Sequence, residues 1–206
     1  MVRPPTYLRF LYPGVVWNFP TTEKIIYLTF DDGPIPEVTS KVLDLLKQYN
    51  AQATFFCIGE NVKKHPEVYK RILAEGHGVG NHTYTHPNCW KVNADDFCEN
   101  VKKASTVIHS NLFRPPYGKL TPRTLFRLRK KYRIIMWDVI SCDFDEKVPA
   151  EQVKKNVLTH AGNGSIVVFH DSLKAAPRML KVLPEVLEYY AKRDFIFKKI
   201  EEKRLS

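Results

Sequence analysis

The stretch IIYLTFDDGP, residues 25–34, joins a run of apolar residues to two adjacent carboxylates and a Gly-Pro pair. Isoleucine, tyrosine, leucine, threonine and phenylalanine together favour a buried strand, and Gly33-Pro34 favours a turn that ends it. Asp31 and Asp32 lie at the end of that strand, where like charges repel each other and add nothing to a core. We therefore expect a strand whose carboxyl end carries charge for a chemical purpose.

Strand-like and helix-like segments alternate along the rest of the chain. Near-continuous apolar runs predict parallel strands, and apolar residues at three- and four-residue spacing predict the helices between them. The predicted strands cover residues 24–30, 53–59, 77–82, 133–139, 164–170 and 195–200, and the predicted helices cover 36–49, 65–76, 93–110, 121–132, 149–158 and 175–192. About seven such units favour an α/β fold, a distorted (β/α) barrel of about seven parallel strands, over an open sheet.

The length and composition of the chain fit one barrel domain. Its 206 residues are 44% hydrophobic and 26% charged, which is typical of a globular protein, and they contain no linker or repeat. We expect an irregular lead-in at 1–22, a barrel at 23–200 and a tail at 201–206. The lead-in contains the aromatic residues that we expect to pack against the barrel: Phe10, Tyr12, Trp17 and Phe19.

The first twenty residues show no recognisable export signal, because prolines interrupt any apolar segment. No run approaches the roughly 18 apolar residues that a membrane helix requires. The sequence therefore predicts a cytoplasmic protein without an integral membrane segment. Cell-envelope association stays open, since an export signal that preceded residue 1 could have been removed.

Cysteine usage and net charge limit the expected environment and partners. The four cysteines form no C-x-x-C pair, so we expect reduced thiols with Cys57 in the core, and a Cys89–Cys98 bridge as the alternative. The net charge is +10, and residues 123–133 contain six basic residues and no acid. We interpret that stretch as a solvated helix face, with attraction of a polyanion as the alternative. No nucleic-acid module is recognisable, so no nucleic-acid partner is expected, and a monomer is favoured.

Polar residues follow five of the apolar runs, each time at the carboxyl end. They are Asp31 with Asp32, Asn81 with His82, Arg114 after a short NLF segment, Asp138 with Asp143, and His170 with Asp171. Active sites of (β/α) barrels lie at this edge of the sheet. We therefore expect a functional site there.

The motif HTYTH, residues 82–86, predicts a metal site. Its spacing lets His82 and His86 reach one point, and two histidines with one carboxylate are a ligand set for a divalent transition metal with open positions. Asp32 can supply the carboxylate if the first and third strands are neighbours. Asp31 is then free to take a proton from water, and the cation relieves its repulsion with Asp32. The alternative is a pair of loop histidines bonded to nearby backbone.

Five motifs, in this order, resemble those of the polysaccharide deacetylase family, the NodB-homology group also called carbohydrate esterase family 4. They are TFDDGP (29–34), HTYTH (82–86), RPPYG (114–118), DVISCDF (138–144) and VFH (168–170). The resemblance spans about residues 23–200 and implies a distorted (β/α) barrel in a single domain. It also implies metal-dependent hydrolysis of N-acetyl groups from aminosugar polymers, or of O-acetyl groups from xylan.

The resemblance implies a role for each matching residue. Asp32, His82 and His86 are the implied ligands of one divalent ion. The expected ion is Zn²⁺, and Co²⁺ or a similar ion is the alternative. Asp31 is the implied general base, oriented by Arg114, and His170 is the implied general acid, held in its charged form by Asp143. The backbone N–H of Tyr117 is implied to stabilise the oxyanion. The implied substrate-binding residues are Pro115, Tyr117, Trp137, Phe144 and Val168.

Three positions depart from the family pattern. The usual D-x-x-D-W reads ISCDF, with Ile140 and Phe144 in place of Asp and Trp, and Val168 replaces Leu in L-x-H. The residues that take part in the chemistry are all present, so these changes bear on the acetyl pocket. We expect an N-deacetylase of a glycan that contains N-acetylglucosamine, such as peptidoglycan or a chitin-like chain. An O-acetyl esterase is the alternative, and a non-catalytic carbohydrate-binding barrel is less favoured.

Overall fold

The computed structural model describes residues 2–202, and their core is one curled sheet of eight strands. The strands are β1 Ile25–Asp31, β2 Ala53–Cys57, β3 Gly78–Asn81, β4 Leu112–Phe113, β5 Arg133–Ile134, β6 Val139–Ile140, β7 Ser165–His170 and β8 Ile196–Phe197. Their order is β5-β4-β3-β2-β1-β7-β6, with β8 beside the start of β1, and every pair is parallel. Parallel pairing explains why the strands read as apolar runs joined by helices.

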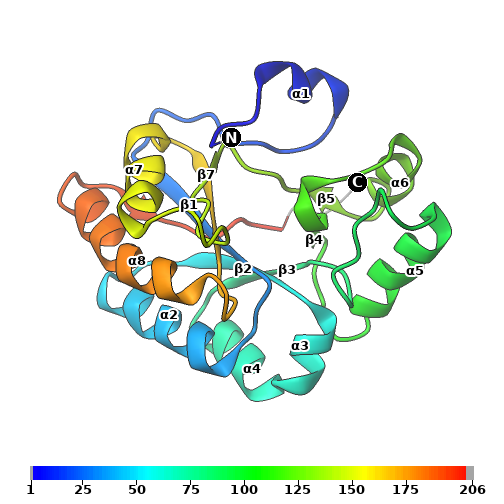
Figure 1. The fold of residues 1–206 in the computed structure, drawn as a ribbon, viewed down its shortest axis with the longest axis horizontal. Coiled ribbons are helices and arrows are strands. Elements are labelled where there is room, and N and C mark those ends of the chain that lie inside the picture. The colour runs from blue at the N-terminus through cyan, green and yellow to red at the C-terminus, as the bar shows by residue number, and fades with distance from the viewer. Residues whose placement is uncertain (1, 203–206) are drawn as a thin grey trace.

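Helices surround the strands on the outside of this sheet (Figure 1). They are α1 Thr6–Leu11, α2 Pro36–Gln48, α3 Gly59–Lys64, α4 Pro66–Ala74, α5 Ala94–Ala104, the short 3₁₀ helix η1 Pro116–Gly118, α6 Pro122–Leu128, α7 Ala150–His160 and α8 Ala176–Ala191. In Figure 1 the helices from α7 round to α6 form an arc, and α1 lies alone on the remaining side. The predicted single-domain α/β fold, a distorted barrel of about seven parallel strands, is confirmed.

Both faces of the central strand β1 are buried. Ile26, Leu28 and Phe30 belong to the large cluster that β1 forms with the helices. Tyr27 packs in a second cluster inside the barrel. Thr29 also points inward, and its Oγ1 accepts a hydrogen bond from Arg114. Burial on both faces leaves Asp31, the last residue of the strand, as its first charged position.

The register of the strands brings their carboxyl ends to one edge. Asp31 of β1 pairs with His170 of β7, Cys57 of β2 pairs with Asn81 of β3, and Asn81 pairs with Phe113 of β4. The residue after each of these strand ends therefore begins a loop at the same rim. The polar residues that end β1, β3, β4 and β7 therefore gather at one edge, as predicted. The expectation is wrong for Asp138, which precedes β6 and accepts hydrogen bonds from Ser165 and Ile166 at the amino end of β7.

The assumed adjacency of the first and third strands is wrong, because β2 lies between β1 and β3. The two strands still deliver their side chains to one point, since both loops turn over the end of β2. The Ile58 N–H donates to Gly33 O at 2.9 Å, and the His82 N–H donates to Cys57 O at 2.9 Å. These bonds hold the loop after β1 and the loop after β3 against the end of β2.

The lead-in contains one helix and part of the barrel wall. Residues 1–22 were expected to be irregular, but α1 forms, and Val16 then pairs with Ile135 and Asn18 with Ser165. Trp17 is buried between these bridges, so the lead-in fills the gap next to β5 and β7. Phe10 does not pack as predicted, because its side chain is 81% exposed on α1.

Several predicted boundaries differ from the structure for identifiable reasons. The strand expected at 133–139 is two short strands, because Met136 donates its N–H to Val16 of the lead-in instead of continuing the ladder. The helix expected at 93–110 ends at Ala104, and the residues that follow form turns. α3 was missed because six residues are too short for a helical pattern to appear. The division into lead-in, barrel and tail stays a prediction, and residues 203–206 of the tail lie outside the described residues.

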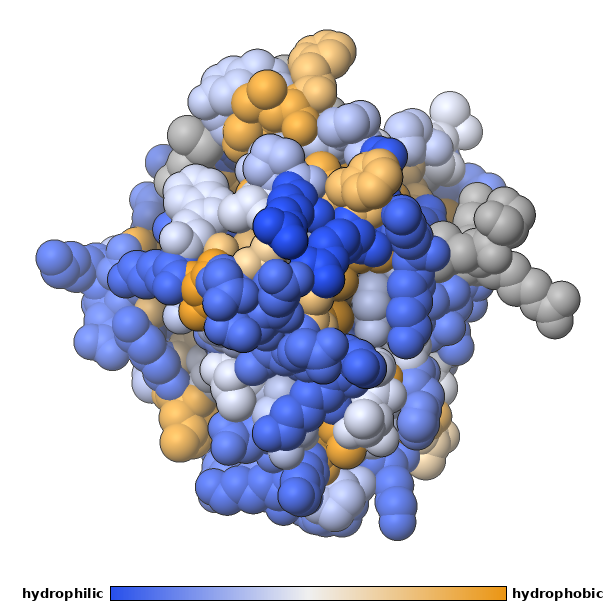
Figure 2. Space-filling model, turned by 90° about the vertical axis from the view of Figure 1, so that its right-hand side faces the viewer, coloured by the Kyte–Doolittle hydropathy of each residue, from blue (hydrophilic) through white to orange (hydrophobic). Residues whose placement is uncertain are grey.

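The basic stretch at 123–133 lies on and after α6, with Leu125 and Leu128 buried beneath it. Figure 2 shows the face on the side of α5 and α6, which is largely hydrophilic, with hydrophobic side chains gathered at the top of the view. Arg123 and Arg127 both pair with Asp95 of α5. These features fit the interpretation as a solvated helix face.

All four cysteines are free thiols, so the alternative of a Cys89–Cys98 bridge is wrong. Cys57 is fully buried, as predicted, and burial raises its pKa well above the usual value, with Asp171 and Asp31 adding to the effect. Between residues 2 and 202, no helix has both the length and the apolar character needed to cross a membrane.

Candidate active site

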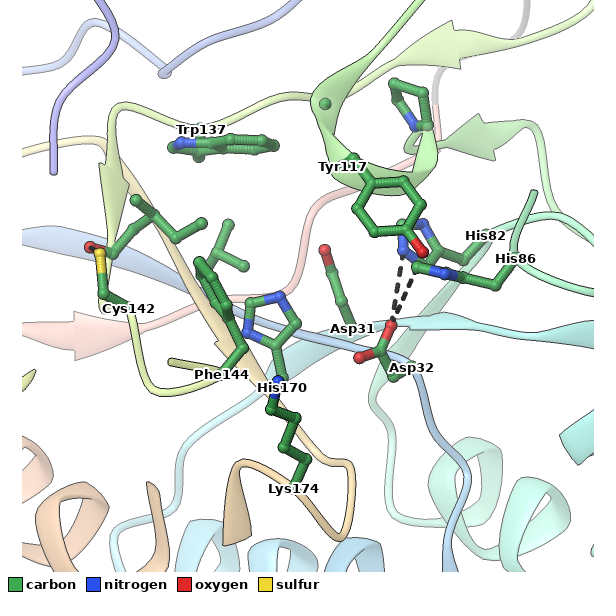
Figure 3. A pocket seen from close by; sticks show the side chains of 14 residues that line it. Asp31, Asp32, His82, His86, Tyr117, Trp137, Cys142, Phe144, His170 and Lys174 are labelled. Carbon is green, nitrogen blue, oxygen red and sulfur yellow. Dashed lines mark hydrogen bonds and ion pairs between the residues drawn. The ribbon is translucent and has the colours of Figure 1, made fainter. Parts of the chain in front are cut away.

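The carboxyl ends of the strands surround a pocket of about 440 Å³ (Figure 3). Its wall is formed by Asp31, Asp32, His82, His86, Pro115, Tyr117, Gly118, Trp137, Ile140, Cys142, Phe144, Val168, His170 and Lys174. All of the predicted site residues therefore line it except Arg114 and Asp143, which hold pocket residues from behind. The pocket brings together residues from loops that are far apart in the sequence.

Asp32, His82 and His86 form a cluster that fits a metal ion. One ligand atom from each lies within 4.8 Å of the other two, and Asp32 Oδ1 is 3.3 Å from His86 Nε2 and 3.8 Å from His82 Nε2. Among the described residues, this buried Oδ1 has no hydrogen-bond partner. An unpartnered buried carboxylate oxygen facing two imidazoles is the arrangement that a cation completes.

The protonation of His82 also suits a ligand. Its Nδ1 lies 2.7 Å from the backbone oxygen of Arg114, so Nδ1 carries the hydrogen and Nε2 faces Asp32 with its lone pair. Burial, followed by repulsion from His86, lowers the pKa of His82 to about 3, although Asp32 opposes the change. Burial likewise lowers the pKa of His86. Both rings are therefore neutral, which metal binding requires.

The backbone is held in an uncommon conformation at several points around the pocket. Asp32 (φ 84°), His86 (φ 57°), Tyr117 (φ 60°) and Cys142 (φ 66°) line the pocket in the left-handed region, and Thr83 (φ 69°) follows His82. Each such non-glycine residue costs about 1–3 kcal/mol, and these conformations cluster at functional sites. The loops therefore favour the position of these side chains over local backbone stability.

Asp31 is held by a buried arginine that crosses the barrel interior. Arg114 Nη1 lies 2.7 Å from Asp31 Oδ1 and 2.7 Å from Thr29 Oγ1, and the other guanidinium nitrogens donate to backbone oxygens of the β5 segment. The guanidinium is fully buried and stacks on Phe56, 4.1 Å from the ring centroid. A charge buried this completely needs the Asp31 carboxylate as its partner, so the pair orients Asp31 toward the pocket.

His170 is held by a buried carboxylate on the opposite side of the pocket. Its Nδ1 lies 2.7 Å from Asp143 Oδ1, and its backbone N–H donates to Asp143 Oδ2 at 2.8 Å. Burial lowers the pKa of His170, but the charge of Asp143 and its hydrogen bond outweigh burial and raise the pKa to about 9. The imidazole is therefore a cation at neutral pH, with Nε2 as the nitrogen that Asp143 does not engage.

Three of the polar residues that were expected at strand ends support the fold rather than the pocket. Asp138 accepts hydrogen bonds from Ser165 Oγ and from the Ile166 N–H, and Asn81 accepts the Thr83 N–H. Asp171 accepts hydrogen bonds from the Gly33 N–H at 2.9 Å and from Thr39 Oγ1 at 2.6 Å, which supports the turn after Asp32. Burial raises the pKa of Asp171 to about 7.

Gly118, Cys142 and Lys174 also line the pocket, although they were not among the predicted site residues. Gly118 and Cys142 lie inside recognised motifs, but Lys174 lies beyond the last motif and reaches the pocket from the segment before α8. Ile140, one of the departures from the family pattern, also lines the pocket. That part of the wall is apolar where the family pattern has a carboxylate.

Comparisons with known proteins show the family of this chain. Residues 18–133 match the family model for polysaccharide deacetylases. A peptidoglycan-N-acetylglucosamine deacetylase of Bacillus cereus is 39% identical over 160 residues, which are 74% of this chain and 58% of that protein. A second Bacillus cereus protein with the same name is 36% identical over 197 residues, which cover 91% of this chain and 92% of that protein.

A solved structure has the same architecture over nearly the whole chain. It is the Bc1960 peptidoglycan N-acetylglucosamine deacetylase in complex with 4-naphthalen-1-yl-N-oxidanyl-benzamide. The TM-score is 0.87 at 32% sequence identity, with 96% of this chain and 95% of that chain covered. The chain therefore belongs to the polysaccharide deacetylase family, as the ordered motifs predicted.

Proposed function

We propose that this protein is a metal-dependent deacetylase that removes N-acetyl groups from N-acetylglucosamine residues of peptidoglycan and releases acetate. The observation that carries the proposal is the convergence of three units on one pocket: the Asp31–Arg114 pair, the cluster of Asp32 with two histidines, and the His170–Asp143 pair. Relatives named as peptidoglycan deacetylases support this choice of substrate.

The proposed metal ligands are Asp32, His82 and His86, and the proposed ion is Zn²⁺, with Co²⁺ as the alternative. Two neutral imidazoles and one carboxylate are suitable donors for either ion. When bound, such an ion supplies a Lewis acid for the acetyl carbonyl and lowers the pKa of water at the site.

Asp31 is the proposed general base. Its carboxylate lines the pocket and is next in the chain to Asp32, while Arg114 fixes it from behind. We propose that Asp31 accepts the proton of the water whose oxygen adds to the acetyl carbonyl carbon. The backbone N–H of Tyr117, on the facing loop, is proposed to donate a hydrogen bond to the carbonyl oxygen as negative charge develops there.

His170 is the proposed general acid. Because its Nδ1 is bonded to Asp143, Nε2 is the nitrogen that can donate a proton. As the carbon–nitrogen bond breaks, His170 protonates the amine of the leaving sugar, and the acetyl carbon leaves as acetate. Phe144 packs edge-on against the His170 ring with centroids 5.1 Å apart, and Trp137 and Val168 line the remaining wall. These three side chains, with Pro115, are proposed to bound the acetyl group.

A panel of acetylated glycans tests the proposal. Acetate is measured after incubation with N-acetylglucosamine oligomers, peptidoglycan and acetylxylan, each with Zn²⁺, with Co²⁺ or after exhaustive chelation. We expect metal-dependent acetate release from the first two substrates. Release from acetylxylan alone would establish an O-acetyl esterase instead, and glycan binding without any release would establish a non-catalytic barrel.

The proposed substrate also bears on where the protein works. Peptidoglycan belongs to the cell envelope, so we propose that the protein acts there. The cytoplasmic location expected from the first twenty residues stays an untested prediction. Fractionation of cells that produce the full-length natural protein distinguishes the two locations.

A further inference from the structure

Trp90 is a large, exposed side chain that the structure nevertheless fixes in place. The side chain is 61% exposed. Its indole N–H donates to Leu120 O at 3.2 Å, and its backbone N–H donates to Asn88 Oδ1 at 3.0 Å. An indole held by its own N–H offers a rigid apolar surface to solvent, and binding to it loses little conformational freedom.

This indole lies beside the pocket, because it joins two loops that form the pocket wall. Trp90 follows His86 by four residues, and its partner Leu120 follows Gly118 by two. Tyr117, next to Gly118 in the chain, is 59% exposed and packs edge-on against His86, with ring centroids 4.7 Å apart. Two exposed aromatic rings are therefore carried by the loops of the pocket wall, Tyr117 against a candidate metal ligand and Trp90 further along the chain.

A free cation accompanies the indole. Lys119 Nζ lies 4.7 Å from the centroid of the Trp90 ring. Within residues 2–202, no carboxylate lies within ion-pair distance of this ammonium group, whereas Arg123 and Arg127 of the neighbouring α6 share Asp95. The ammonium of Lys119 is thus available to an anionic group of a ligand that covers the indole.

We propose that Trp90 and Lys119 form a second subsite, which binds the sugar next to the one that is deacetylated and recognises a carboxylate on that sugar. This inference rests on the proposed function. A pyranose ring presents an apolar C–H face that fits an indole, and a polymer that occupies the pocket must extend over the neighbouring loops. In peptidoglycan strands that lack stem peptides, each N-acetylglucosamine is flanked by N-acetylmuramic acid, whose lactyl ether then carries a free carboxylate. The subsite therefore selects this alternating, anionic glycan over a neutral chitin-like chain.

Binding to the chelated protein tests the subsite without turnover. Titration calorimetry is carried out with two probes: the N-acetylglucosamine tetramer, which is neutral, and a tetrasaccharide of alternating N-acetylglucosamine and N-acetylmuramic acid. We expect Lys119→Gln to weaken binding of the alternating tetrasaccharide about fivefold and to leave the neutral tetramer unchanged. Trp90→Ala should weaken both about tenfold.

Matched variants distinguish loss of the subsite from the general effect of removing a surface charge or an exposed aromatic ring. Lys130→Gln removes the same charge from the surface after α6, and Phe126→Ala removes another exposed aromatic ring, which is 53% exposed. Both should bind the two probes like the wild type. Trp90→Phe keeps an aromatic ring but loses the bond to Leu120 O, so recovery of most of the affinity assigns the effect to stacking on the sugar. If Trp90→Phe binds as poorly as Trp90→Ala, the residue supports the loop and the subsite is overturned.

The subsite and the proposed function can fail separately. If no glycan releases acetate but the alternating tetrasaccharide binds with this dependence on Trp90 and Lys119, the subsite stands and the deacetylase proposal fails. If acetate is released and neither substitution changes binding or KM for either probe, the subsite fails alone. Absence of measurable binding by the wild type to both probes also overturns it.

Discussion

The two sides of the pocket each combine histidine with aspartate, and the results are opposite. On one side, His82 and His86 face Asp32, and burial lowers the pKa of both rings. On the other side, His170 contacts Asp143, and its pKa rises to about 9 despite burial. The same two residue types therefore give neutral rings on one side and a cation on the other.

The difference comes from what each Nδ1 contacts. His82 Nδ1 bonds a backbone carbonyl, which fixes the tautomer without a full negative charge, and its neighbour His86 opposes a second positive charge. His170 Nδ1 bonds a fully buried carboxylate at 2.7 Å, which stabilises the imidazolium. Neutral rings can bind a metal ion, whereas a cationic ring can donate a proton, so one fold prepares both in a single pocket.

Removing a histidine from the side of the pocket that contains His82 and His86 should have the largest effect on activity. His86→Ala removes one of three proposed metal ligands, and we expect acetate release to fall by about 10⁴-fold, because metal stabilisation is worth several kcal/mol of barrier. His160→Ala removes an imidazole from the end of α7, outside the pocket, and should keep the wild-type rate. A normal rate in His86→Ala would remove the metal from the mechanism.

Removing the proposed base between the two sides should have the next largest effect. Asp31→Asn preserves the shape of the carboxylate but cannot accept a proton, so we expect kcat to fall by about 10³-fold. Loss of one partner of the buried pair with Arg114 also destabilises the fold by about 3–5 kcal/mol. The rate is therefore measured well below the melting temperature of the variant. Retained metal binding shows that the site is intact, and wild-type kcat would exclude Asp31 as the base.

The cationic side predicts a pH dependence that Asp143 controls. His170 acts in its protonated form, so activity should be present below its pKa of about 9 and decline as the pH rises through that value. Asp143→Asn removes the main group that raises this pKa, while burial continues to lower it. The alkaline limb of the kcat/KM profile should therefore move to lower pH, with about a tenfold loss of rate at pH 8.

A nearby aspartate provides the control for that profile. Asp138→Asn alters a buried carboxylate of the same segment that bonds Ser165 and Ile166 rather than His170. It should lower the melting temperature and leave the alkaline limb where it is. Equal shifts in Asp138→Asn and Asp143→Asn would mean that the contact with His170 is not what sets its protonation.

The smallest effect is expected at the rim of the cationic side. Phe144 is partly exposed and covers one edge of the His170 ring. Phe144→Ala should raise KM about threefold and leave kcat nearly unchanged, because the ring bounds the pocket without touching the reacting bond. A large fall in kcat with unchanged KM would assign Phe144 to the chemical step instead.

The strand ends were the most informative part of the sequence. Apolar runs followed by Asp31, His82 and His170 predicted both the parallel sheet and the edge that carries the site, because charged and imidazole side chains are costly beside a buried strand unless they are paired. The H-x-x-x-H spacing predicted that His82 and His86 come together with Asp32, even though the assumed neighbour of β1 was wrong. The loops after β1 and β3 both turn over the end of β2. They therefore bring Asp32 close to the two histidines although their strands are not neighbours.

Other features depend on contacts between distant segments and left no local pattern. Arg114 reaches Asp31 only because the sheet curls, and Met136 leaves the ladder only because the lead-in pairs with it. Lys174 lies outside every motif and reaches the pocket through the path of the chain before α8. Periodicity and composition report burial, so they carry little information about which polar side chains meet inside a barrel.

If the two sides of the pocket have separate tasks, only variants of the side with His82 and His86 lose bound metal. Zinc per chain is measured after gel filtration for the wild type, His86→Gln and His170→Gln, each loaded with Zn²⁺ at neutral pH. We predict about one ion per chain in the wild type and in His170→Gln, and almost none in His86→Gln. Loss of zinc from His170→Gln, or full retention of zinc by His86→Gln, would contradict the division of the pocket.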